Sequence, residues 1–219
     1  LSLPIQLLFM KSAGAGVPLV KKPSEAHQKE LGEPMFSADG KYVYYSQNVT
    51  PGATFIYAQD SHGDLFNIKR YDMETGEVTT AVSGLGGAVR PTPSPDGKQI
   101  AFVRRELAKS KLYVKDLASG AERKIYDDLD QDMQETWAVH GAYPNMDWTP
   151  DSKSLVFWAG GKIRRINVAT GDVSEIPFHV QGARAVIDPP RPQVDVAPDS
   201  FETRMPRFAS VSPDGERVV

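Results

Sequence analysis

One short sequence unit occurs four times along the chain, and it constrains the fold more than any other feature. Its Asp recurs at spacings of 57, 55 and 63 residues, at Asp39, Asp96, Asp151 and Asp214. Pro or Ala precedes this Asp, which can accept a backbone hydrogen bond, and Gly follows it and adopts a positive φ. A short apolar segment follows each of the first three copies, so each unit predicts a tight β-hairpin. At the third copy Ser152 replaces Gly, and we expect a slightly different or strained turn there.

A second unit follows each of the first three copies at a constant spacing. An Asp or Asn is followed four residues later by Gly, in 72–76, 116–120 and 167–171. Each copy lies between two segments rich in β-forming residues, so it predicts a second hairpin turn. The predicted strands are 42–45, 65–71, 79–82, 99–103, 111–115, 122–126, 154–158, 162–166 and 173–177.

Two hairpins per repeat give a four-stranded antiparallel sheet that cannot bury both of its faces alone. Radial packing of such sheets solves this problem, so the fold class is all-β, a β-propeller of about four blades within a larger propeller. We expect one propeller domain over 1–219, with blades at 31–83, 88–127 and 143–178. The outer strands of a blade are expected in 1–22 and the inner strands of another in 204–219. These ends either pair into one composite blade or are the edges of a longer propeller.

The composition excludes several function classes. A net charge of -3 with interspersed Lys and Arg argues against a nucleic-acid partner. The chain has no Cys, and its four His residues are not spaced to share a metal. A phosphate-binding loop and the Gly-x-Ser-x-Gly sequence of serine hydrolases are absent. Residues 1–10 are too short and too polar for membrane insertion. The sequence therefore predicts no catalytic residue, no metal and no cofactor.

The segment before each Asp-Gly turn should form the innermost strand, beside the central channel. Glu33, Arg90, Tyr143 and Arg204 lie in these segments, and the first three directly precede Pro. An Arg in this place can hold a carboxylate of a ligand or partner through two parallel hydrogen bonds. The alternative is that Arg90 and Glu33 form an ordinary channel salt bridge.

The link between the second and third blades, 127–148, is the least repetitive part of the chain. Long loops on a rigid scaffold often carry function, which makes Trp137 and His140 candidates for binding a protein or peptide. Loop packing for Trp137 and a structural hydrogen bond for His140 are the alternatives. Trp148 occupies a core position of the repeat, so we expect it to serve in blade packing. The acidic run 127–135 lacks the Gly and Glu of an EF-hand, and a solvated loop is the simpler interpretation.

The Ser-Pro-Asp-Gly turn followed by Lys and an apolar strand resembles the TolB-type β-propeller repeat, and this similarity covers nearly the whole chain. Two longer stretches, 86–97 and 132–146, are similar to the propeller of secreted bacterial TolB-like amidohydrolases. In that family a propeller precedes a metal-dependent barrel whose first signature is His-x-His, which this sequence lacks. The resemblance implies a periplasmic or secreted location and a neighbouring catalytic domain.

These observations predict a non-catalytic propeller that binds a protein partner, or that gates substrate entry to a neighbouring domain. A homodimer through open blade edges is a further expectation, because unpaired strand edges promote association. Two alternatives assign enzymatic activity to a longer parent protein: a hydrolase acting on carbon–nitrogen bonds, or a prolyl-oligopeptidase-like peptidase. A His-x-His or a Gly-x-Ser-x-Gly sequence in that parent would distinguish them.

Overall fold

A computed structural model describes residues 8–9, 16–21, 23–29, 31–56, 62–132, 143–188, 190, 194–195, 197–202 and 207–218. The chain divides into two compact units, Leu1–His179 and Val180–Val219. Three four-stranded antiparallel sheets make up most of the first unit, and in each sheet the strands pair in chain order. The prediction of a β-propeller built from four-stranded blades is thus confirmed.

We number the complete blades in chain order. Blade 1 contains β3 (Leu31–Phe36), β4 (Tyr42–Asn48), β5 (Phe66–Asp72) and β6 (Val78–Val82). Blade 2 contains β7 (Val89–Pro93), β8 (Gln99–Glu106), β9 (Lys109–Asp116) and β10 (Glu122–Tyr126). Blade 3 contains β11 (Met146–Trp148), β12 (Ser154–Ala159), β13 (Lys162–Asn167) and β14 (Val173–Ile176). The predicted strands agree with these bounds to within three residues.

The repeated Asp residues have the structural role that the sequence indicates. In blade 2, Asp96 Oδ1 accepts hydrogen bonds from the Ser94 hydroxyl (2.6 Å) and the Lys98 amide (3.1 Å). Gly97 follows with a φ of 70°. Ser152 has a φ of 58° at the same position of blade 3, so the expected strain at this turn is confirmed.

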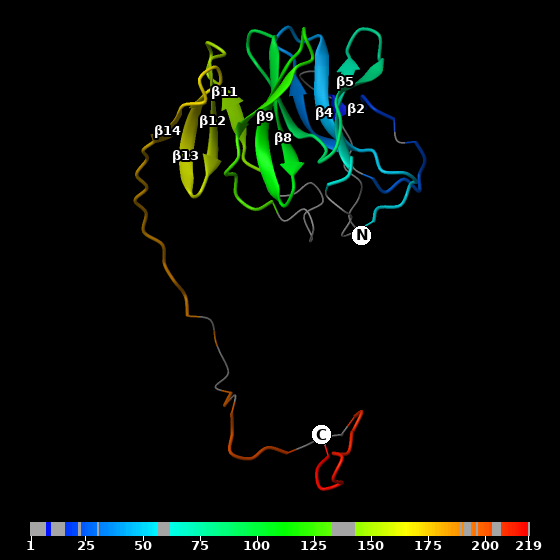
Figure 1. The fold of residues 1–219 in the computed structure, drawn as a ribbon, viewed down its shortest axis with the longest axis vertical. Helices are drawn as coiled ribbons and strands as arrows, with labels where there is room; N and C mark the ends of the chain where they lie inside the picture. Colours follow the sequence, from blue (N-terminus) through cyan, green and yellow to red (C-terminus); the bar gives the residue numbers. More distant parts are fainter. Residues whose placement is uncertain are drawn as a thin grey trace. The chain divides into compact units, whose positions relative to one another are not determined.

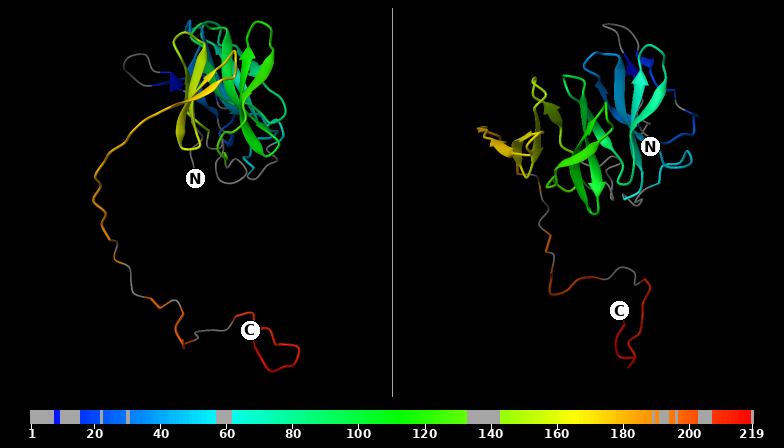
Figure 2. Two further views of the ribbon diagram at one scale, coloured as in Figure 1. Left: turned by 60° about the vertical axis from the view of Figure 1, so that its left-hand side comes forward. Right: turned by 45° about the horizontal axis from the view of Figure 1, so that its top comes forward.

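The blades lie side by side in chain order, as Figures 1 and 2 show. A core cluster that includes Tyr44, Ile68 and Phe102 joins blade 1 to blade 2. A larger cluster that includes Val103, Trp148 and Phe157 joins blade 2 to blade 3. The first strands of neighbouring blades contact each other, β3 with β7 and β7 with β11, which makes them the innermost strands.

The two ends of the chain form small local structures. β1 (Leu8–Phe9) pairs antiparallel with β2 (Val17–Pro18) in the first unit. In the second unit, the fourth Asp-Gly turn closes with a bridge between Val211 and Val218. Whether these ends belong to one blade, and the single-domain organisation over 1–219, stay predictions. Within the described ranges, no helix is long and apolar enough to cross a membrane.

Candidate functional site

The innermost strands of blades 1 and 2 share an unusual backbone feature at two of the predicted site residues. Glu33 and Arg90 each precede a Pro and have φ values of 58° and 59°. The strand register shifts at both places, between Gly32 and Met35 in β3 and between Val89 and Thr92 in β7. Such bulges redirect side chains, and a positive φ in a residue with a Cβ costs about 1–3 kcal/mol.

The bulges bring Glu33 and Arg90 together across the interface between blades 1 and 2. Arg90 Nε lies 3.3 Å from Glu33 Oε1, and the Arg90 backbone amide donates to Glu33 Oε2 (2.7 Å). The Ser46 hydroxyl donates to the same Oε2 (2.6 Å). Arg90 Nη2 also donates to the backbone carbonyl of Tyr143 (3.3 Å), which precedes the first strand of blade 3. Three predicted residues from three consecutive repeats therefore form one network, which we call the inner-edge network.

A buried ion pair lies beside this network. Arg105 Nη1 donates to Asp132 Oδ1 (2.8 Å), and the Ser110 hydroxyl donates to Asp132 Oδ2. Burial raises the pKa of the Tyr143 hydroxyl, and the negative charges of Asp132 and Glu33 raise it further. The positive charges of Arg105 and Arg90 oppose this shift. The Tyr143 side chain therefore stays protonated at neutral pH, near two carboxylates and two guanidinium groups.

The remaining predicted residues fall into two groups. Trp137, His140 and Arg204 lie outside the described residues, so their binding roles stay predictions. Trp148 is buried between blades 2 and 3, and its indole Nε1 donates to the Thr92 carbonyl (2.8 Å). Its expected packing role is confirmed. Within the described ranges, no three His, Cys, Asp or Glu side chains lie close enough to hold a metal ion.

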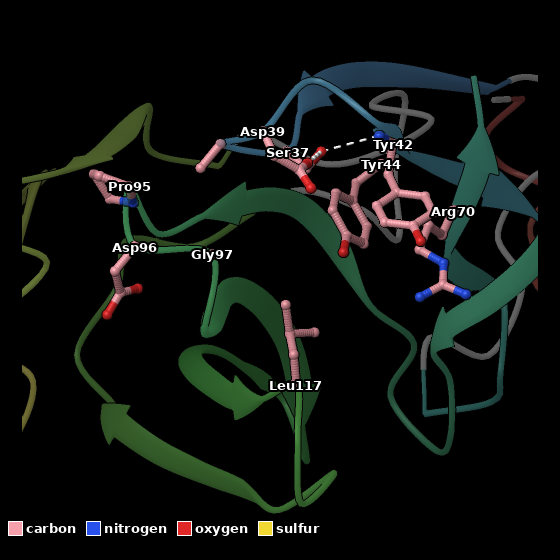
Figure 3. Close-up of a pocket in the computed structure, with 10 residues that line it drawn as sticks. Ser37, Asp39, Tyr42, Tyr44, Arg70, Pro95, Asp96, Gly97 and Leu117 are labelled. Carbon is pink, nitrogen blue, oxygen red and sulfur yellow. Dashed lines mark hydrogen bonds between the residues drawn. The ribbon is translucent and has the colours of Figure 1, made fainter. Parts of the chain in front are cut away.

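The structure also contains a cleft that the sequence pattern did not reveal. A cavity of about 600 Å³ opens between the Asp-Gly turns of blades 1 and 2. We call it the turn-face cleft, and its lining residues are Ser37, Ala38, Asp39, Tyr42, Tyr44, Arg70, Pro95, Asp96, Gly97 and Leu117. Figure 3 shows Tyr42, Tyr44 and Arg70 on one side and Pro95, Asp96 and Gly97 on the other.

The signal for this cleft lies in a comparison between repeat copies. Three residues before the turn Asp, blade 3 has the bulky Trp148, whereas blade 2 has Pro93. A comparison of the repeat copies position by position could therefore have indicated that these two blade interfaces pack differently.

Comparison with known structures supports the fold. The chain is similar to TolB from Acinetobacter baumannii (TM-score 0.54, 21% identity, 75% of this chain and 35% of that chain). It is also similar to a TolB from Agrobacterium tumefaciens (TM-score 0.51, 18% identity, 75% and 53%). A puromycin-hydrolysing peptidase from Mycobacterium tuberculosis matches at a TM-score of 0.50 with 17% identity, over 75% and 26%.

No family model matches the sequence, and no curated protein matches it either. The chain spans between about a third and about half of the length of the two TolB structures. Its fold is that of a TolB-like β-propeller.

Proposed function

We propose that this chain is a non-catalytic interaction propeller within a larger secreted or periplasmic protein related to amidohydrolases. Its inner edge positions a neighbouring catalytic domain or gates the entry of substrate. The observation that carries this proposal is the inner-edge network, in which Glu33, Arg90 and Tyr143 from three repeats meet. A surface shared by several blades is suited to bind one partner rigidly.

Arg90 is the residue of this network that a partner can reach. Its side chain is 29% exposed, while Glu33 is 13% exposed. A carboxylate of the partner can bind the exposed part of the guanidinium group, since Arg forms strong paired hydrogen bonds with carboxylates. Strained residues such as Glu33 and Arg90 are frequent at binding sites, which is consistent with this role.

The open face of blade 3 supports the assignment to a larger assembly. Val156 and Trp158 lie on this face beside a cavity of about 440 Å³, and the Trp158 residue is 39% exposed. The equivalent residues of blade 2, Ala101 and Val103, are buried against blade 3. Exposed apolar surface of this kind favours association, either with a further blade or with a second copy of the chain.

A peptidase propeller is the second candidate. The specific observation is the similarity to the puromycin-hydrolysing peptidase, of which the match covers only 26%. In this second candidate function, the propeller would control the access of peptides to a neighbouring serine hydrolase domain. For this protein, the parent sequence would then contain Gly-x-Ser-x-Gly instead of His-x-His.

Hydrogen–deuterium exchange tests the proposed inner-edge contact. We would measure exchange in β3 and β7, both in this chain alone and in the complete parent protein. We expect slower exchange in the parent, and Arg90→Gln should remove this additional protection, whereas Arg165→Gln on blade 3 should not. Equal exchange in the two proteins would overturn the proposal.

The mass in solution tests the open face separately. If blade 3 associates through exposed apolar surface, light scattering on this chain should detect a dimer or larger species. Trp158→Arg should then restore the monomer. A monomeric wild-type chain would contradict homodimerisation, and it would leave the exchange experiment unaffected.

A further inference from the structure

Two repeat positions distinguish blade 2, which borders the turn-face cleft, from blade 3. Trp148 is buried between blades 2 and 3, while blade 2 has the smaller Pro93 at the same repeat position. One residue after the turn Asp, Ser152 Oγ accepts a hydrogen bond from the Asp96 amide (3.0 Å) and joins the turns of blades 2 and 3. Gly97 has no side chain with which to join the turns of blades 1 and 2.

The wall of the cleft that blade 1 provides is also different in character. Where blade 2 presents the buried apolar residues Ala101 and Val114, blade 1 presents Tyr44 and Arg70. The blade 1 wall therefore offers a hydroxyl group and a guanidinium group where blade 2 offers only apolar atoms. Its volume of about 600 Å³ lies within the range that small-molecule sites occupy.

Arg70 is the cationic group of the cleft. Its guanidinium carbon lies 4.6 Å from the centre of the Tyr42 ring, and Tyr44 lines the same cleft. Across the part of the chain that the structure describes, Arg70 has no ion pair with a carboxylate. A guanidinium group positioned over an aromatic ring can still donate hydrogen bonds to the carboxylate of a ligand.

Asp39 and Asp96 provide negative charge to the same cleft. Asp39 Oδ1 accepts from the Ser37 hydroxyl (2.7 Å) and the Lys41 amide (3.1 Å), and the Asp96 turn repeats this pattern. These hydrogen bonds lower the pKa of both carboxyl groups, so both are ionised at neutral pH. They use Oδ1 of each carboxylate. Asp39 Oδ2 lies 3.9 Å from Lys41 Nζ, a long and exposed contact that a bound ammonium group can replace.

We propose that the turn-face cleft binds a short peptide with free termini. Arg70 pairs with the peptide carboxylate, and Asp39 and Asp96 pair with the α-ammonium group. Leu117 and the rings of Tyr42 and Tyr44 contact an apolar side chain (Figure 3). Charges of both signs favour a zwitterion, because a ligand with only one charge leaves part of the cleft uncompensated. This proposal is independent of the inner-edge function, since the two sites use different residues.

Isothermal titration calorimetry with three forms of one dipeptide tests the charge pattern. The probes are Ala-Leu, its N-acetylated form and its C-terminal amide, and free leucine serves as a fourth probe. We expect Ala-Leu to bind at least about tenfold more tightly than either blocked form, since each loses a hydrogen-bonded charge pair. Binding of free leucine as tight as that of Ala-Leu would contradict a peptide ligand and would indicate a site for free amino acids. Equal affinity for the zwitterion and both blocked forms would overturn the proposal.

Variants of the cleft test its location. Arg70→Gln should weaken Ala-Leu binding about tenfold or more and abolish the preference for a free carboxylate. Arg165→Gln is the matched control, because Arg165 occupies the same repeat position on blade 3, outside the cleft. Asp96→Asn should reduce the preference for a free ammonium group, because Asp39 still lines the cleft, and it retains an oxygen acceptor for the turn. An unfolding midpoint close to wild type verifies that each variant is folded. Wild-type binding by Arg70→Gln, or loss of binding by Arg165→Gln, would show that the peptide binds elsewhere.

Discussion

The interface between blades 2 and 3 is filled, whereas the interface between blades 1 and 2 contains a cleft. Both interfaces are built from the same repeat and have an apolar core at the same strand positions. The filled interface buries Trp148 and joins its two turns through Ser152. The interface with the cleft has Pro93 and Gly97 at these positions.

The two interfaces indicate that the shared repeat residues specify the architecture. A few variable positions then determine how closely each pair of blades packs. The turn residues and strand pattern are shared because each blade must close two hairpins and bury both faces. The position three residues before the turn Asp has no such constraint. A large side chain there increases the buried apolar area, and a small one leaves space for a ligand.

Removal of the large side chain should have the greatest effect on stability. Trp148→Ala removes a buried indole and its hydrogen bond to Thr92, and we expect a loss of about 3–5 kcal/mol in the free energy of unfolding. Pro93→Ala at the same position of blade 2 should change it by about 1 kcal/mol or less. Urea unfolding measures both values. Similar losses for the two variants would show that the interfaces do not differ as described.

Breaking the buried Arg105–Asp132 ion pair should reduce the free energy of unfolding more than breaking the Glu33–Arg90 pair. Asp132→Ala removes the buried carboxylate that accepts hydrogen bonds from Arg105 and Ser110, which should cost about 3 kcal/mol. Glu33→Gln in the more exposed pair with Arg90 should cost about 1–2 kcal/mol, since water solvates the remaining guanidinium. Urea unfolding at neutral pH measures both losses. A greater loss for Glu33→Gln would contradict this order.

The sequence predicted the blades well because turn chemistry is local. Asp96, Gly97 and Ser94 determine their hairpin through contacts within a few residues, so the pattern alone identified the turn and both strands. The meeting of Glu33 and Arg90 across two blades was weighed as a channel salt bridge. The two bulges that direct these side chains toward each other were not predicted, because a bulge depends on pairing with the next strand.

The turn-face cleft could not be predicted for a related reason. Tyr44 and Arg70 appear in the sequence as ordinary strand residues, and neither forms a recognisable motif. Their meeting with Gly97 depends on how one blade packs against the next, which a repeat pattern does not specify.

Substitution of the residue after the turn Asp should change the stability less. Ser152→Gly relieves a positive φ and loses the hydrogen bond to the Asp96 amide, two effects of about 1 kcal/mol each that oppose one another. Gly97→Ser places a side chain at a φ of 70°, which should cost about 1 kcal/mol. Nothing lies within 4 Å of the added Cβ, so a steric clash is not expected. Thermal unfolding should detect a lower midpoint for Gly97→Ser only. A lower midpoint for Ser152→Gly as well would mean that the Asp96 hydrogen bond contributes more than the strain.

The smallest expected effect is the acid sensitivity of single turns. Hydrogen bonds within the turns lower the pKa of Asp39 and Asp151 below the ordinary value of 3.8, and both residues are exposed. Because their pKa values are lower in the folded state, these carboxylates contribute stability above about pH 4, and it is lost as the pH falls through the folded pKa. Asp151→Asn and Asp39→Asn should therefore each reduce the difference in unfolding midpoint between pH 7 and pH 3. Ala-Leu should increase the contribution of Asp39 to this pH dependence, because Asp39 lines the cleft and its ionised form pairs with the ammonium group of the peptide. The contribution of Asp151, which is not among the lining residues, should stay unchanged. An equal change at both residues would place the peptide outside the cleft.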